Sequence, residues 1–261
     1  MIGGPEIHAG YVRRLFRAEA AGRLTFDKIV VVDRDPSCAA AGLVGERVRL
    51  EVAPWNDWLA ENLSHHSPSD HVVPYHWAPH LLLDWLKADL DQRGFSLARS
   101  PDPGEPPVRP PVLRGTGAGD LAMSYAEWLC PPACIEPALC PHTRGDKSWS
   151  LATDLSGAGQ SFVFPCLHLA YGVGTIPVAA IFGVRDRLVD EHRRGEIGAR
   201  ASLWVGTASH CHGLAARVEV WRRPPGRAGV ATNFPGWDTE LRARPRNSVP
   251  RDKPLDPKIT G

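Results

Sequence analysis

The sequence predicts an α/β protein with a Rossmann-like parallel sheet in its N-terminal half, a Cys/His-containing α/β second half, and an irregular C-terminal tail rich in proline and arginine. Three observations support this prediction. Short β-branched runs alternate with amphipathic segments over roughly the first hundred residues, cysteines and histidines gather in the second half, and prolines concentrate in two stretches.

The first expected element is an amphipathic helix, because apolar residues from Tyr11 to Phe16 recur at helical spacing with arginines on the opposite side. Strands are then predicted from β-branched or alternating runs, and helices from apolar residues at helical spacing. The strands are expected at 29–32, 47–52 and 71–75, and the helices at 55–63 and from 81 to near 94. This alternation implies βαβ units and a parallel sheet.

Two short motifs in this region carry a family resemblance. Met1-Ile2-Gly3-Gly4 is similar to the end of a first strand and a glycine turn, and Val30-Val31-Val32-Asp33 is a strand that ends in an acid. In these features the chain resembles the NAD(P)-binding Rossmann superfamily, although Pro5 interrupts the usual glycine fingerprint. The resemblance implies that Gly3 and Gly4 approach a cofactor pyrophosphate and that Asp33 binds the adenosine ribose. S-adenosylmethionine-type sites also use an acid at this strand end.

Proline-rich stretches divide the chain. Residues 100–118 are expected to form a Pro/Gly-rich linker, because prolines lack the backbone donor that a helix or a central strand needs. This linker separates a nucleotide-binding layer at 1–99 from a Cys/His metal-site region at 119–221. Residues 222–261 are expected to form an irregular tail.

The composition limits the classes of function. Apolar residues make up 43% and charged residues 23% of the 261 residues, as in ordinary globular proteins. A net charge of +1 provides no overall field for nucleic acid or an anionic membrane, so neither partner is expected. The apolar runs are far shorter than the ~20 residues that cross a bilayer. The first residues lack the features of a secretory signal, so a cytoplasmic location is expected.

The sharpest chemical signal is a segment that places three cysteines and a histidine close together. Cys130, Cys134, Cys140 and His142 follow the spacing C-x3-C-x5-C-x-H, and intervening prolines stiffen the segment. Thiolates bind soft and borderline cations, so the segment predicts a site for zinc or a [4Fe–4S] cluster. The alternative is that these are buried, reduced cysteines, since free cysteine is often buried. A redox disulfide is a third interpretation.

A further ligand is expected from His142 or from a second segment, which contains His210, Cys211 and His212. If the backbone there is extended, the two histidines share one face and Cys211 points to the other, so only one kind of ligand would enter the site. Cys166 and His168 form a weaker candidate pair.

Three functions remain open from the sequence. The first is an oxidoreductase that acts on a small-molecule substrate and combines an NAD(P)-type cofactor with the zinc or iron–sulfur site. The second is a non-catalytic zinc protein that binds a partner. The third is an S-adenosylmethionine-dependent methyltransferase. Ligand number separates the first two, because structural zinc sites are closed and catalytic ones keep an open position.

Overall fold

The structure is a computed structural model that describes residues 5–74 and 80–224. All of these residues except Pro224 belong to one compact unit. The predicted tail at 222–261 lies almost entirely outside the described residues. None of the described helices is long and apolar enough to cross a membrane.

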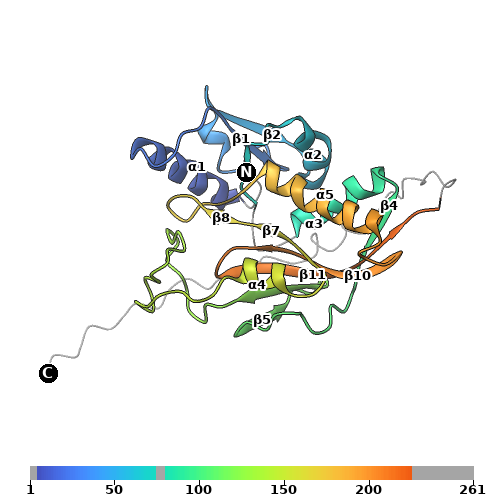
Figure 1. Cartoon of the computed structure of the whole chain (residues 1–261). Coiled ribbons are helices and arrows are strands. Elements are labelled where there is room, and N and C mark those ends of the chain that lie inside the picture. Colours follow the sequence, from blue (N-terminus) through green and yellow to red (C-terminus); the bar gives the residue numbers. More distant parts are fainter. Residues whose placement is uncertain (1–4, 75–79, 225–261) are drawn as a thin grey trace, which may run out of the picture. The chain divides into compact units, whose positions relative to one another are not determined.

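The N-terminal part begins with helix α1 (Pro5–Ala20), followed by strands β1 (Ile29–Asp33) and β2 (Val48–Val52), which pair in parallel (Figure 1). The predicted helix and the first two predicted strands are therefore confirmed in position. The apolar face of α1 packs on the two strands in one buried cluster, which includes Val12, Val31 and Val48. Burial of this face stabilises the helix, because an isolated helix of this length is marginal in water.

The parallel sheet of the N-terminal half has two strands in the described chain, and this corrects the prediction of a larger Rossmann-like sheet. The third predicted strand, β3 (His71–Val72), pairs antiparallel with β9 (Gly174–Pro177), which also pairs with β8 (Leu167–His168). Pro74 follows β3 closely and removes a ladder donor, which favours a very short strand. The general α/β class holds.

The largest sheet contains six strands. Its main order is β5 (Val112–Gly115), β6 (Asp120–Ser124), β11 (His212–Arg222), β10 (Arg200–Ala208) and β7 (Ser161–Pro165). The long strand β11 pairs with β6 through its first half and with β4 (Phe95–Arg99) through its second half. The sheet therefore includes β4 from the first predicted part and β5 from the predicted linker.

Helices cover both faces of this sheet (Figure 1). Helices α3 (Leu81–Gln92) and α5 (Val178–Arg194) lie on one face, where buried residues such as Phe164, Val205 and Val218 form the main core together with α2 (Trp55–Asn62). The short helix α4 (Leu151–Gly157) covers the other face. Side chains alternate between the faces along each strand, so one strand supplies both cores.

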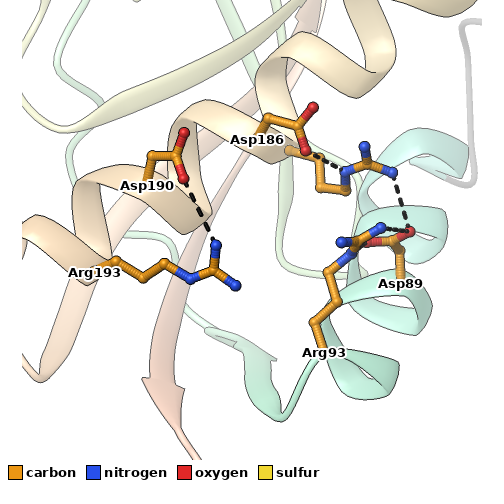
Figure 2. Close-up of polar contacts among 6 residues, drawn as sticks. Asp89, Arg93, Asp186, Asp190 and Arg193 are labelled. Carbon is orange, nitrogen blue, oxygen red and sulfur yellow. Dashed lines mark hydrogen bonds and ion pairs between the residues drawn. The ribbon is translucent and has the colours of Figure 1, made fainter.

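Charged side chains link α3 to α5 (Figure 2). Asp89 of α3 pairs with Arg93 at 2.5 Å and with Arg185 of α5 at 3.3 Å, and Arg185 also contacts Asp186 at 2.8 Å. Arg185 and Asp89 are half-buried, so the cost of removing their charges from water offsets much of their attraction, and the two helices are positioned mainly by the apolar core beneath them.

Candidate metal centre

The two segments that carry the predicted metal ligands meet at the tip of the β10–β11 hairpin. The tip comprises residues 209–211, and each of its three carbonyl oxygens accepts a hydrogen bond from another element. Ala152 and Leu151 at the start of α4 donate to Ser209 and His210 at 3.0 and 2.9 Å, and Tyr125 after β6 donates to Cys211 at 2.9 Å. The tip is therefore a fixed junction to which β6 and α4 are tied.

The buried carboxylate of Glu136 joins the other segment to this tip. We use the name Cys loop for residues 125–150, between β6 and α4. Glu136 accepts hydrogen bonds from the Ser209 hydroxyl at 2.8 Å and from the backbone N–H groups of His210 at 2.8 Å and Cys211 at 3.2 Å. Its backbone is left-handed, with φ of 52°, which is unfavourable for a residue with a side chain. The hydrogen bonds hold it there.

The charge balance around Glu136 favours its ionised form. Burial raises the pKa of this carboxyl, but the nearby charge of His168 and the hydrogen bonds from Ser209 and His210 outweigh burial and hold the pKa below its usual value. The sequence pattern did not single out this residue. Its signal was that it is the one acid between Cys130 and His142, within the proline-rich part of the Cys loop.

A tight turn brings the end of the Cys loop back to the hairpin tip. The N–H of Cys140 donates to the carbonyl of Gly145 at 2.9 Å, and the N–H of Arg144 donates to the carbonyl of Cys140 at 2.8 Å. This turn places the Lys147 amine 4.0 Å from the sulfur of Cys211. The Cys140 turn is therefore in direct contact with Cys211 of the hairpin tip.

Two thiols of the loop accept backbone hydrogen bonds. The N–H of Glu136 donates to the sulfur of Cys134 at 3.3 Å. Backbone N–H groups of Thr143 and His142, together with the Thr143 hydroxyl, lower the pKa of the Cys140 thiol. Donors that point at a sulfur favour its thiolate form, which is the form that binds metals.

The charge of Glu136 influences the pKa of both Cys130 and Cys211. Burial raises the pKa of Cys130, and the nearby negative charges of Cys134, Cys140 and Glu136 raise it further. Burial and the charge of Glu136 raise the pKa of Cys211 to about 11, while the charge of Lys147 acts in the opposite direction. All four predicted cysteine ligands are thus gathered around one part of the molecule.

Two buried indole donors face these thiols. The Nε1 atoms of Trp128 and Trp149 have no hydrogen-bond partner within the described part of the chain. Trp128 nevertheless approaches Cys130 closely enough to lower the pKa of that thiol, and Trp149 does the same for Cys211. An unpaired buried donor costs about 1–3 kcal/mol, and a thiolate would accept both of these N–H groups.

The predicted histidine ligands occupy different environments. The ring of His142 is stacked on Trp128, with centroids 4.6 Å apart, and the residue is exposed. His210 is exposed too, whereas His212 is half-buried and its Nδ1 lies 2.9 Å from the Ser124 hydroxyl. Because residues 209–211 form a tight turn, the extended-strand alternation expected there does not apply. Cys211 and His212 both lie near Glu136.

Strands β8 and β9 and the turn between them pack against the Cys loop. His168 of β8 donates from Nδ1 to the carbonyl of Cys134 at 3.0 Å. At Gly172, with φ of 71°, an added Cβ would lie 2.0 Å from the carbonyl oxygen of Pro132, so only glycine allows this approach. The thiol of Cys166, just before β8, is half-buried, and its desolvation raises its pKa to about 12.

The thiols are neighbours, but they do not converge. All six cysteines are free, and the described residues contain no group of three or more His, Cys, Asp and Glu side chains placed to hold a metal ion. Metal binding would therefore require the side chains of the Cys loop to close around the ion.

The predicted nucleotide-site residues lie elsewhere. Gly3 and Gly4 are outside the described residues. Asp33 is buried at the end of β1, where its carboxylate accepts a hydrogen bond from the N–H of Asp35 at 3.0 Å. This places an acid at the carboxyl end of a parallel strand, as expected from the sequence.

Comparison with known proteins gives a match to a family model. No curated protein and no solved structure matches the chain significantly. Residues 78–221 match the model of a family, AF_1314_C, that is described as "Uncharacterized protein, C-terminal domain". The matched residues include the Cys loop and the β10–β11 hairpin, and they make up more than half of the chain, so the chain belongs to this family.

Proposed function

We propose that this protein binds a zinc ion through Cys130, Cys134, Cys140 and Cys211, and that the ion fastens the Cys loop to the hairpin tip. The observation that carries the proposal is the set of hydrogen bonds from the hairpin tip to Glu136, which holds the loop beside Cys211. The contact between Lys147 and Cys211 supports the same pairing of segments.

The donor set suits a closed zinc site. Four thiolates are a common structural zinc set, and sulfur is well matched to this cation. The backbone donors at Cys134 and Cys140 and the indole donors at Trp128 and Trp149 would surround the sulfurs as an outer layer. Such outer donors orient ligands and stabilise their charged form.

Zinc would also explain how an irregular loop stays folded. Structural zinc sites in small peptides contribute about 10–16 kcal/mol to folding near neutral pH, far more than a few hydrogen bonds. The Cys loop exposes large apolar side chains, with Leu129 96% exposed and Leu139 56% exposed, so apolar burial contributes little to its stability. A bound ion would replace that missing contribution.

Metal analysis of the full-length protein, purified without oxygen or chelators, tests the proposal. We expect about one equivalent of zinc in the wild type, and its loss in Cys134→Ser. Cys38→Ser is the matched control, because Cys38 is also a free thiol but is buried in the α1–β1–β2 cluster. Retention of zinc by Cys134→Ser would refute the ligand set. A brown protein that contains iron and sulfide would refute zinc and support a [4Fe–4S] cluster on the same thiolates.

A catalytic role is a second candidate, and it includes the predicted oxidoreductase. It is favoured by Asp33, a buried acid at the carboxyl end of β1, where a nucleotide ribose would bind. Calorimetric titration with NADH, NADPH and S-adenosylmethionine tests it. Binding of a nicotinamide cofactor that weakens at least tenfold in Asp33→Asn, but not in the exposed control Asp27→Asn, would support the oxidoreductase. Binding of S-adenosylmethionine alone would favour the methyltransferase, and no binding would reject both.

A further inference from the structure

Polar side chains form a continuous chain from α2, past the start of α3, to the end of β10. Asn56 contacts Asp84, Asp84 pairs with Arg99, Arg99 pairs with Asp120, Asp120 faces His80, and His80 contacts Thr207. Buried polar and charged groups cost free energy, and apolar residues of similar size often stabilise a core better. Where a sequence departs from a purely apolar core in this way, a function is the expected reason.

The ring of His80 lies between a hydroxyl and a carboxylate. Its Nε2 is 3.1 Å from Oγ1 of Thr207, and its Nδ1 is 3.8 Å from Oδ1 of Asp120. Neither this Nδ1 nor this Oδ1 has a hydrogen-bond partner within the described chain, and both are buried. The second distance is longer than a hydrogen bond, as is common at catalytic sites without a substrate. The order hydroxyl, imidazole, carboxylate is that of a nucleophile, its general base and the group that orients the base.

The carboxylate of Asp120 favours one tautomer of His80. Arg99 lies 3.4 Å from the other carboxylate oxygen, Oδ2, which leaves Oδ1 to face the ring. An ionised carboxylate accepts hydrogen bonds and cannot donate them, so the neutral ring is expected to carry its proton on Nδ1. Nε2 then has a lone pair and accepts the hydrogen bond of the Thr207 hydroxyl. The same carboxylate stabilises the imidazolium that forms when Nε2 takes up a proton.

Thr207 is the accessible end of this array. His80 and Asp120 are 1% and 2% exposed, whereas Thr207 is only half-buried. Thr207 is the penultimate residue of β10 and pairs in register with Phe164 of the parallel strand β7. It therefore lies at the carboxyl ends of two parallel strands, which is the edge where α/β sheets bind ligands. Its neighbour in register on β11, Leu214, is also apolar, so these surroundings suit an apolar acyl group.

Helix α3 begins directly after His80 and adds a favourable charge. His80 is the N-cap residue of this helix, but its ring contacts Thr207 and makes no cap hydrogen bond. The N-terminus of a helix carries a partial positive charge. This charge favours the negative charge that develops on a carbonyl oxygen when a nucleophile attacks beside His80, which is the effect that an oxyanion hole provides.

We propose that Thr207 is the nucleophile and His80 the general base of a site that hydrolyses apolar carboxylic esters, with Asp120 positioning the imidazole. The Thr207 oxygen bonds to the carbonyl carbon, and its proton passes to Nε2 of His80. His80 gives this proton to the alkoxide oxygen as the bond from that oxygen to carbon breaks, which releases the alcohol and leaves an acyl–threonine ester. Water then attacks this ester and gives a proton to His80, and the acid leaves as Thr207 recovers the proton. None of these residues belongs to the proposed zinc site.

Covalent labelling of the full-length protein tests the nucleophile. A fluorophosphonate probe traps an activated hydroxyl, because the hydroxyl oxygen displaces fluoride from phosphorus. We expect mass spectrometry to find the adduct on Thr207, and we expect the labelling rate to fall about 10²–10⁴-fold in His80→Gln. Thr153→Ala is the matched control and should be labelled at the rate of the wild type. Thr153 is an exposed threonine whose hydroxyl contacts Ser150 rather than a histidine.

Variants of the nucleophile keep the proposal open to refutation. Thr207→Val removes the hydroxyl and should abolish labelling, and Thr207→Ser keeps a hydroxyl and should still be labelled at this position. Circular dichroism shows that each variant is folded, and the serine variant decides the matter if the valine variant does not fold. A folded wild type without an adduct on Thr207, or with equal labelling of Thr153, overturns the proposal.

Nitrogen NMR of the histidine rings tests the positioning role of Asp120. In the wild type we expect the neutral ring of His80 to carry its proton on Nδ1. Asp120→Asn should move this proton to Nε2, because an amide can donate to Nδ1. The signal of His80 is assigned by its absence in His80→Gln. A wild-type proton on Nε2 would mean that His80 donates to Thr207, which would overturn its role as the base. The zinc proposal stands or fails independently of this result.

Discussion

The six-stranded sheet and the Cys loop are built in opposite ways. In the sheet, large apolar residues such as Phe162 and Val205 are almost fully buried, and helices cover both faces. In the loop, the large apolar residues Leu129 and Leu139 face outward, whereas a charged residue, Glu136, is buried. The comparison shows that apolar burial stabilises the sheet, while the loop depends on a few directional bonds and on the ion that we propose.

The largest expected effect is in the sheet. Phe164→Ala should lower the free energy of unfolding by about 3–5 kcal/mol, because it leaves a cavity in a fully buried core. Denaturant unfolding followed by far-ultraviolet circular dichroism measures this. Leu113→Ala, at a partly exposed position of β5, is the control and should change little. An equal effect of the two substitutions would contradict the assignment of the core.

A somewhat smaller effect is expected from the carboxylate that ties the loop to the hairpin. Glu136→Gln should cost about 2–4 kcal/mol, because a neutral amide cannot satisfy three donors as the carboxylate does. Limited proteolysis should show faster cleavage at Arg144 and Lys147 than in the wild type. Glu127→Gln, an exposed acid of the same loop, should behave like the wild type. Cleavage that begins instead in the sheet would count against the separation of the two regions.

The close approach of β8–β9 to the loop gives a third comparison. Gly172→Ala should destabilise the protein by about 1–3 kcal/mol, because a Cβ would meet the carbonyl oxygen of Pro132 at a position with positive φ. Gly157→Ala in α4 meets no atom and should be neutral or slightly stabilising. Thermal unfolding of the pair measures the difference, and similar melting temperatures would mean that the two segments do not touch.

The pH dependence of the free energy of unfolding should show what the buried charge of Asp84 costs. Burial raises the pKa of Asp84, although the charges of Arg99 and His80 oppose this. The native state then binds this proton more readily than the unfolded state does, so the stabilisation is present below about pH 4, the pKa of an unfolded Asp, and is lost as the pH rises through the folded pKa. Asp84→Asn should remove this part of the pH dependence of unfolding, and the exposed control Asp57→Asn should not. Identical pH profiles of wild type and Asp84→Asn would refute the shift.

The smallest effect is expected at the ion pairs between α3 and α5 (Figure 2). A double-mutant cycle of Arg185→Ala and Asp89→Ala should give a coupling energy of at most about 1 kcal/mol. The same cycle on Arg193 and Asp190, which are 3.8 Å apart and more exposed, should give a value near zero. A larger coupling would mean that directional bonds also contribute to the helical part of the molecule.

The sequence by itself determined the local elements with a regular apolar pattern and the residue types of the candidate metal centre. The run Ile29–Asp33 forms a strand because its β-branched residues fit a buried extended chain, and α1 forms because one face of its helix is apolar. The cysteines of the Cys loop were identified from their spacing alone.

Only the tertiary structure decided which distant segments pair. Strand β3 pairs with β9, about a hundred residues later, rather than with β1. The local sequence does not predict this pairing, because backbone hydrogen bonds form in the same way with any partner strand. The role of Glu136 could not be predicted for the same reason. Its carboxylate oxygens accept hydrogen bonds from residues more than seventy positions away, and only folding brings these donors within reach.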